Sequence, residues 1–421
     1  LGTCGQTVSL GTGATQTGFG RTGTVDWDTT PKTATFTAVS GDGFFADTTG
    51  SAFNMNLPAG SAGAIVSVAD YAGTWNSNNL TVVPNGTDKI GGTNANATLD
   101  TQGQSVTFIF VDSTKGWINT MDSTSNVRGL SFLTATGGTI TTSGNCKIHT
   151  FTGPGNFIVC SVGSPSINNQ VSYLVVAGGG GGGGSYSGGG GGGGFREFKG
   201  PQTPYTASPL DGSTPITVTS TTFPIAVGAA GAGGPNPGAN IGSTGSVSTF
   251  STITSAGGGG GAGETDAGLP GGSGGGGSYP TQAAGDGNTP PTSPPQGQPG
   301  GTGGTGTPGG HYVSGGGGGA TEAGVNGNPA PTPSGRGGAG ATTSISASPT
   351  AYSGGGGASG GNSPTTGGGA SPCGTGGAGA NNPGTGAVGT TNRGGGGGAG
   401  TNGSGGGNGG SGIVIIRYKF Q

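Results

Sequence analysis

The sequence carries little charge. Lys and Arg supply 12 residues and Asp and Glu 15, so charged side chains make up 6% of the 421 residues, against about 25% in an ordinary soluble domain. The basic residues form no cluster, and a nucleic-acid partner requires concentrated Lys and Arg to neutralise its phosphates. We therefore expect no nucleic-acid binding.

Long apolar runs are also missing. No stretch approaches the ~18 apolar residues of a membrane-spanning helix, and no basic amphipathic helix is visible. Membrane insertion is therefore not expected.

The chain opens at Leu1 with no charged-then-apolar leader, so we expect an export signal or an N-terminal anchor domain to be already absent.

Residue types that carry metal or catalytic chemistry are scarce. The four cysteines include no CxxC pair, which argues against a zinc site. Of the two histidines, His149 lies in a strand-like pattern that favours a structural role, and His311 lies between glycine runs. The glycine runs lack the Gly-Lys-Ser/Thr ending of a phosphate-binding loop. We predict no catalytic residue, no metal site and no cofactor.

Carboxylates near the start of the chain leave one metal alternative open. Asp26 and Asp28 flank Trp27 and could bind Ca²⁺ together with Asp42 or Asp47. No EF-hand and no repeated Gly-Asp pattern supports such a site. Solvated surface carboxylates are the favoured interpretation.

Glycine is what the sequence has in excess. The 111 glycines are about a quarter of the chain, against roughly 7% in average proteins. Glycine does not recur strictly at every third position, and the 27 prolines are too few for collagen. Ordinary globular architecture and collagen are both excluded for much of the chain.

Composition divides the chain into three parts. Residues 1–22 are rich in Gly, Thr and Ser and are predicted to form a connector. Residues 23–130 contain short runs of period-two alternation between turn clusters, and this pattern predicts an antiparallel β-sandwich. Residues 138–421 are predicted to form a glycine-rich domain. The predicted fold class is therefore all-β.

Apolar strands bracket the glycine-rich stretch. The run Tyr173–Ala177 leads into it, and Ile413–Phe420 follows it. Because either strand alone would be an exposed apolar edge, both are expected to return to one sheet. The glycine-rich domain is thus predicted to have a small β base, residues 138–177 and 412–421, and an insert, residues 178–411.

The β base contains a predicted hairpin. Cys146 and Cys160 flank a turn formed by Gly153, Pro154 and Gly155, and facing strands would bring both sulfurs to one side of the sheet. A cross-strand disulfide in an oxidising compartment is one interpretation, and two buried free thiols are the other.

The glycine runs need a special arrangement to be ordered. Fixing each backbone costs ~1–2 kcal/mol, and a net hydrogen bond returns only ~0.5–1.5 kcal/mol. Extended helices with three residues per turn and no side chains pack closely enough to bond several neighbours. We therefore predict a polyglycine II-type bundle. The alternative, a flexible linker, has no need of embedded strands such as Phe223–Val227.

A resemblance to a known family rests on a set of motifs in fixed order. They are HTFTGPGNFIV (149–159), YLVVAGGGGGGG (173–184), FPIAVGAAGAGG (223–234), VSTFSTITSAGGGGGAG (247–263) and SGIVIIRY (411–418). This set resembles the glycine-rich domain of bacteriophage tail-fibre and adhesin proteins. A β domain of phage tail proteins, especially those of marine phages, is similar to the segments at 57–75, 79–92 and 106–118.

The resemblance implies a non-enzymatic tail-fibre or adhesin component. Such a protein is a virion appendage outside the cell, usually a homotrimer, and it recognises a host-surface polysaccharide or an outer-membrane protein through rod tips. No virion-attachment domain is visible in the chain. A secreted, self-assembling extracellular filament subunit on a cell surface is the alternative, and a polysaccharide depolymerase is a third hypothesis.

Tyrosines are the predicted receptor contacts. Tyr186, Tyr279, Tyr312 and Tyr352 are among the few large side chains between the glycine runs. Tyrosine supplies rigid, amphipathic contact area, and loops on rigid scaffolds often carry function. The alternative role for these residues is to pack the ends of the bundle together.

Overall fold

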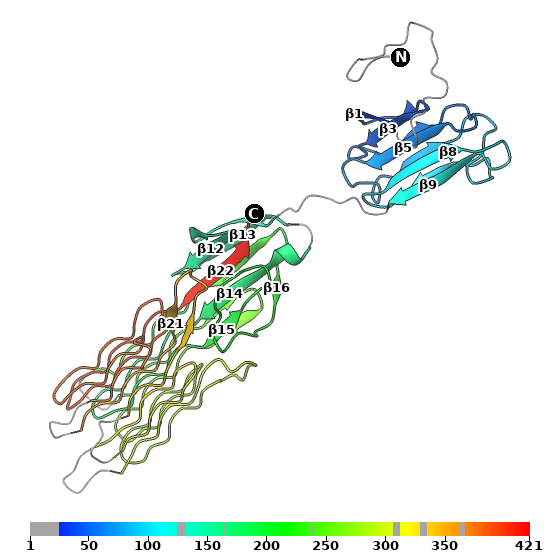
Figure 1. Ribbon diagram of the computed structural model, residues 1–421. Coiled ribbons are helices and arrows are strands. Elements are labelled where there is room, and N and C mark those ends of the chain that lie inside the picture. The colour runs from blue at the N-terminus through cyan, green and yellow to red at the C-terminus, as the bar shows by residue number, and fades with distance from the viewer. Residues whose placement is uncertain are drawn as a thin grey trace, which may run out of the picture. The chain divides into compact units, whose positions relative to one another are not determined.

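The computed structural model describes residues 25–123, 132–163, 166–236, 240–305, 312–328, 335–361 and 367–421. The predicted connector at residues 1–22, together with Cys4 and His311, lies outside the described residues. The chain divides into two compact units, Leu1–Gly129 and Leu130–Gln421, and the structure of both is almost all β (Figure 1). In the part of the chain that the structure describes, no helix has the length and hydrophobicity needed to cross a membrane.

The first unit has two sheets around one core. One sheet has the order β1-β3-β5-β8-β9, formed by Asp26–Lys32, Asp42–Ala46, Ile65–Asp70, Ser105–Phe110 and Trp117–Ser123. The other has the order β2-β4-β6-β7, formed by Phe36–Thr37, Phe53–Asn56, Leu80–Val83 and Ala97–Leu99. Both sheets contribute to a single buried cluster that includes Phe44, Met55 and Trp117.

Strand direction in the first unit corrects the prediction of antiparallel sheets. Strands β1, β3 and β5 run parallel, and so do β2, β4 and β6. Antiparallel pairs are β5 with β8, β8 with β9 and β6 with β7. The prediction was wrong for the first six strands because consecutive strands alternate between the two sheets. Every second strand then enters the same sheet in the same direction.

The second unit has two larger sheets and a two-stranded one. The first has the order β11-β12-β22-β14-β15, formed by Thr139–Ser143, Cys146–Phe151, Ile413–Lys419, Gln170–Val176 and Phe195–Phe198, with β16 (Ile216–Thr217) also paired to β14. The second has the order β10-β13-β17-β18-β19, formed by Thr134–Thr136, Gly155–Ser161, Thr222–Ala226, Ser248–Phe250 and Ile253–Ser255. The small sheet pairs β20 (Ala341–Thr343) with β21 (Thr350–Tyr352), and a 3₁₀ helix covers Ser166–Asn169.

The two strands that bracket the glycine-rich stretch return to one sheet, as predicted, and they pair directly in it. Strands β14 and β22 are antiparallel, with Tyr173 opposite Ile416 and Val176 opposite Ile413. Their side chains alternate between two buried clusters: Tyr173 and Val175 belong to one, and Leu174 and Val176 to the other. Burial on both faces explains why these runs are continuously apolar.

Extended glycine-rich segments, which we call the glycine-rich bundle (residues 178–411), project from this sheet and return to it (Figure 1). Every third amide of Gly178–Gly184 donates to one neighbouring segment, residues 240–246. The remaining amides donate to residues 188–191 and 407–410, and the carbonyls accept from residues 231–234, 258–261 and 397–400. The central run therefore has six neighbours with a three-residue repeat, all supplied by the same chain.

Candidate functional site

Glycines of the central run of the bundle leave no room for a side chain. A Cβ added at Gly179, Gly180 or Gly182 would overlap a backbone carbonyl of an adjacent segment, closer than the 3.0 Å that real Cβ atoms respect. The glycine excess in the sequence is thus a packing requirement of the bundle. With its interior backbone groups bonded on all sides, the bundle is a rigid support for the turns at its ends.

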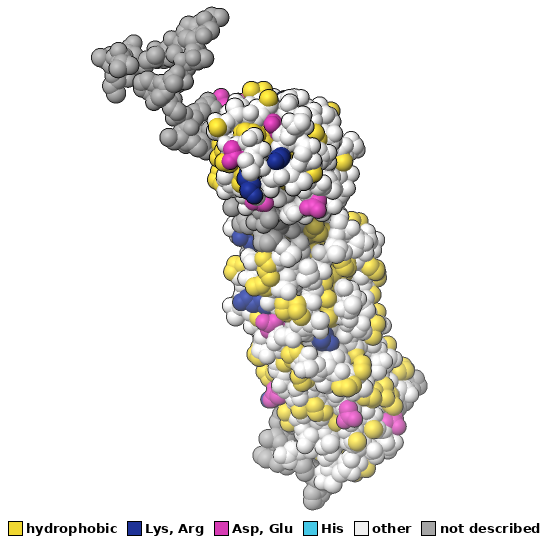
Figure 2. All heavy atoms as spheres, turned by 90° about the vertical axis from the view of Figure 1, so that its right-hand side faces the viewer, with side chains coloured by type: hydrophobic (Ala, Val, Ile, Leu, Met, Phe, Trp, Pro, Cys, Tyr) yellow, Lys and Arg dark blue, Asp and Glu magenta, His cyan; other side chains and the backbone are white. Residues whose placement is uncertain are grey.

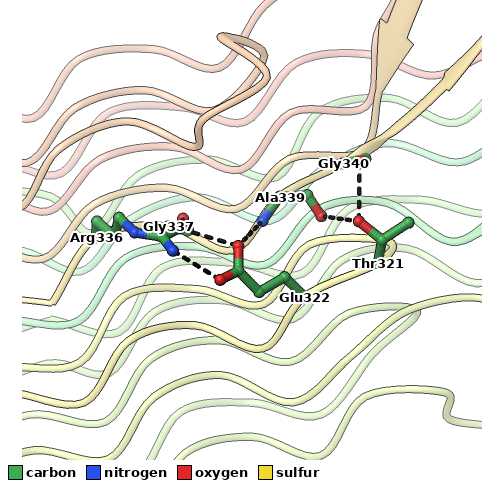
Figure 3. A network of polar contacts seen from close by, with 6 residues as sticks. All are labelled: Thr321, Glu322, Arg336, Gly337, Ala339 and Gly340. Carbon is green, nitrogen blue, oxygen red and sulfur yellow. Dashed lines mark hydrogen bonds and ion pairs between the residues drawn. The ribbon is translucent and has the colours of Figure 1, made fainter.

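An ion pair ties two segments of the bundle together (Figure 3). Both guanidinium amino groups of Arg336 donate to Glu322, at 2.6 and 3.0 Å, and the same carboxylate accepts the backbone N–H of Ala339 at 3.1 Å. The neighbouring Thr321 hydroxyl donates to the carbonyls of Ala339 and Gly340. Arg336 holds the pKa of the Glu322 carboxyl below its ordinary value. The pair is half-exposed, so solvent screens it and its contribution to stability is small.

Three of the four predicted tyrosines meet at one end of the bundle. Tyr186 lies in the turn between the runs that leave β14 and lead into β15, so this turn marks the bundle end farthest from those strands, here called the distal end. The ring of Tyr312 lies 4.8 Å from that of Tyr186 and 4.5 Å from that of Tyr279, between centroids. All three side chains are half-buried. We call this group the tyrosine cluster.

The surroundings of the tyrosine cluster are polar. Burial raises the pKa of the Tyr186 hydroxyl, with smaller contributions from Tyr312 and Glu264, while the Asn382 side chain acts in the opposite direction. The amide oxygen of Asn382 is buried and has no hydrogen-bond partner among the described residues. The Ser314 hydroxyl donates to the Tyr186 carbonyl at 3.0 Å, which anchors the turn to a second segment. The distal end therefore combines aromatic side chains with a carboxylate and a buried amide.

The fourth predicted contact residue, Tyr352, is in a different place. It lies in β21, is 2% exposed, and packs with Leu174, Phe195 and Ile415 in a buried cluster. The guanidinium of Arg393 lies 5.1 Å from its ring centroid. Tyr352 is therefore a core residue and not an exposed tip, which corrects its assignment as a receptor contact. The sequence pattern resembled a tip because a glycine run, Gly354–Gly357, begins just after Ser353.

Of the two interpretations of Cys146 and Cys160, the disulfide is not present, and the alternative of buried free thiols holds for Cys146 alone. Both are free cysteines, with Cys146 buried and Cys160 exposed. Strand β12, which holds Cys146, pairs with β11 and β22, whereas β13, which holds Cys160, pairs with β10 and β17. The intervening turn carries the chain from one sheet to another instead of forming a hairpin. Each cysteine therefore faces different neighbours.

The other candidate residues have structural partners. His149 is buried, with Nδ1 2.7 Å from the Gly137 carbonyl and Nε2 3.2 Å from the Tyr418 hydroxyl, and burial lowers its pKa. Asp28 bonds Lys32 at 2.6 Å, and Asp47 accepts from Thr49. Among the described residues, no group of three His, Cys, Asp or Glu side chains is placed to hold a metal ion.

One buried polar cluster escaped the sequence analysis. Glu197 is fully buried in β15, where its carboxylate accepts the backbone N–H of Ser208 at 3.0 Å and the hydroxyl of Thr343 at 2.5 Å. Burial raises its pKa. Nearby, the guanidinium of Arg417 lies 5.4 Å from the ring centroid of Tyr205. The cluster joins β15 to β20 at the base of the bundle. Its only sequence signal was the group of charged residues Arg196, Glu197 and Lys199 in a stretch otherwise poor in charge.

The surface of the glycine-rich unit carries little charge. On the face shown in Figure 2, its acidic and basic side chains are few and lie apart, between polar and apolar surface. Of the described residues in this unit, none therefore forms a charged patch on that face that would attract a polyanion or a polycation.

Comparison with known proteins identifies the family. The family model of a glycine-rich domain matches residues 152–419, which is more than half of the chain, so the protein belongs to the glycine-rich domain family. The matched region contains β14, β22 and the whole glycine-rich bundle. No curated protein matches the sequence.

Proposed function

We propose that the protein is a non-enzymatic structural component of an extracellular appendage that recognises a host surface. The resemblance to tail-fibre and adhesin proteins favours a virion appendage. In this proposal the first unit is a β-sandwich spacer and the bundle carries the receptor contacts. The partner is a surface polysaccharide or an outer-membrane protein.

The tyrosine cluster is the observation that carries the proposal. Tyr186, Tyr279 and Tyr312 come from distant parts of the sequence, yet the ring of Tyr312 contacts both others, tilted against Tyr186 at 4.8 Å and edge-on to Tyr279 at 4.5 Å between centroids. Half-buried aromatic groups on rigid loops lose little entropy on binding and offer both apolar faces and hydroxyl groups. A flexible linker would not hold them together.

The hydrogen-bond pattern supports a polyglycine II-type bundle. A period of three residues and six neighbours per central run are what packed three-fold extended helices would give. Such a bundle needs no second chain around Gly178–Gly184, because all six neighbours belong to one molecule. The expected homotrimer would therefore form through other surfaces.

A filament subunit is the second candidate, and one edge strand favours it. Strand β11 (Thr139–Ser143) lies at the edge of its sheet, carries no charge, and exposes four of its five residues. Edge strands usually carry charge, proline or bulges that prevent pairing with another chain. An Ile140→Lys variant tests this candidate: if electron microscopy shows filaments of the wild-type chain that the variant abolishes, the filament function is preferred.

Cell binding tests the adhesin function. Fluorescently labelled full-length protein is incubated with a panel of Gram-negative cells, and Tyr279→Ala and Tyr312→Ala variants are compared with Tyr71→Ala, an exposed tyrosine of the first unit. We expect the two distal variants to weaken binding by about tenfold or more, equivalent to ~1.4 kcal/mol, and the control to bind like wild type. Equal binding by all variants would remove the tyrosine cluster from the proposal, and release of oligosaccharides from cell-surface glycans would refute the non-enzymatic function.

A further inference from the structure

The outer face of the five-stranded sheet in the first unit carries a groove that the proposed function does not use. Strand register places Trp27, Gly43, Ser67, Thr107 and Met121 in one row across all five strands. The three central residues of the row are small and the two at its ends are large. The result is a groove of about 510 Å³ between Trp27 and Met121.

Trp27 forms a flat platform on one side of this groove. A Cβ added at Gly43 would come within 2.7 Å of the indole, so the ring lies directly over that glycine. The ring of Phe45 supports it from the side, with centroids 4.9 Å apart and planes inclined by 32°. Trp27 is 41% exposed, whereas Trp75 and Trp117 are fully buried. An exposed indole face held in a fixed orientation is available to a ligand.

Hydroxyl groups form the floor of the groove. The Ser67 and Thr107 hydroxyls lie 2.7 Å apart and bond each other. Because each hydroxyl has one hydrogen and two lone pairs, the pair keeps one O–H group and several lone pairs that this bond does not use. Ser67 and Thr107 lie at the bottom of the groove and are 4% and 7% exposed, so an apolar partner would remove the solvent contact that remains to these groups, at a cost of up to ~1–3 kcal/mol for each. The floor therefore suits a ligand with hydroxyl groups of its own.

Charge is nearly absent from the groove. Among its lining residues, the charged one is Asp122, which lies opposite the core residue Val106, on the other face of the sheet from Met121, and accepts a hydrogen bond from Gln104 at 3.0 Å. No Lys or Arg belongs to the lining. A phosphate, a sulfate or an acidic sugar would find no counter-ion here, which leaves an uncharged polar ligand.

We propose that this groove binds a neutral saccharide. The C–H groups of one pyranose face stack on Trp27, because the negative face of an aromatic ring attracts weakly positive hydrogens, and the sugar hydroxyls bond the Ser67 and Thr107 pair. Met121, which is 60% exposed, closes the opposite side. The volume lies within the range of about 300–1,000 Å³ found for small-molecule sites. This site lies in a different unit from the tyrosine cluster, so the test of saccharide binding here is independent of the test of the adhesin function.

Tryptophan fluorescence of the full-length protein tests the proposal directly. Since Trp27 is the exposed one of the three tryptophans, its quenching by acrylamide reports on the groove. The probes are maltose, cellobiose, lactose, mannobiose and chitobiose. We expect at least one of them to shift the emission to shorter wavelength and protect it from acrylamide, in a saturable manner. No effect from any of the five overturns the proposal.

Variants test whether a saccharide that binds the protein does so in the groove. Trp27→Ala and Met121→Ala should each weaken saccharide binding, measured by calorimetry, by about tenfold or more, whereas Trp27→Phe should retain part of it and Val111→Ala, outside the groove, all of it. Met121 and Val111 are both exposed, so their replacement leaves the core intact. Saccharide binding that survives both groove variants overturns the proposal, and so does a change in oligomeric state without any saccharide effect, which would make the groove a contact between copies of the chain.

Discussion

The close packing of the bundle predicts how glycine-to-alanine substitutions change the free energy of unfolding. Of two glycines in the bundle, Gly182 should lose stability on replacement by alanine and Gly369 should gain it. A Cβ at Gly182 would overlap the carbonyl of Gly398, whereas at Gly369 the nearest atom is the Cβ of Arg336 at 3.9 Å. Neither glycine has a positive φ. Gly182→Ala therefore tests close packing, and Gly369→Ala is its matched control in the same bundle.

The expected magnitude for Gly182→Ala follows from the contacts that must yield. Moving the segment 397–400 away would break the bonds from Gly397 and Gly400 to the carbonyls of Gly180 and Gly183. Two lost hydrogen bonds and overpacking together outweigh the entropic gain of alanine, so we expect a loss of about 2–5 kcal/mol. Gly369→Ala keeps only the entropic gain and should stabilise by ~0.4–1 kcal/mol.

Denaturation with two probes separates the units. All three tryptophans, Trp27, Trp75 and Trp117, lie in the first unit, so their fluorescence should give the same midpoint in both variants and in wild type. Hydrogen exchange of peptides covering residues 178–194 reports on the bundle, and it should accelerate in Gly182→Ala alone. Unchanged protection in Gly182→Ala, or equal losses in the two variants, would refute the packing argument.

Further predictions concern buried titratable groups. Because burial raises the pKa of Glu197 above its ordinary value of 4.5, the unfolded state releases this proton first, so stability should fall as pH rises above about 4.5 towards the folded-state pKa. A Glu197→Gln variant, followed by denaturation between about pH 4 and about pH 8, should lose this part of the pH dependence, and an unchanged profile would contradict the burial argument. The exposed Cys160 should react with a thiol reagent in the native protein, whereas Cys146 should react only after unfolding. Mass spectrometry of the labelled peptides distinguishes them, and rapid native labelling of Cys146 would contradict its placement.

The sequence predicted the positions of strands where the burial of apolar side chains determined them. The apolar runs at Tyr173–Ala177 and Ile413–Phe420 had to be covered, so both were expected to join one sheet, and β14 and β22 are neighbours in that sheet. Period-two alternation likewise located strands such as β6, Leu80–Val83. Both inferences depend on the burial of apolar side chains, which the periodicity of the sequence indicates directly.

The sequence did not predict which strands pair with each other. Turn residues at Gly153–Gly155 fit a hairpin and a crossing between sheets equally well, and they do not reveal that β12 pairs with the long apolar strand β22. The same ambiguity hid the parallel pairing of β1, β3 and β5. A local turn signal does not specify whether the next strand joins the same sheet.

The tyrosines show the same limit within the bundle. Tyr186 and Tyr352 both lie near glycine runs, yet Tyr186 lies at the distal end and Tyr352 lies in the buried cluster at the base of the bundle. Their difference comes from what precedes them: Tyr186 interrupts two glycine runs, whereas Tyr352 ends an alternating segment that forms β21 and buries its last side chain. An aromatic residue flanked by glycine on both sides is therefore the better signal for a distal turn, because a strand on one side brings the ring back to the core.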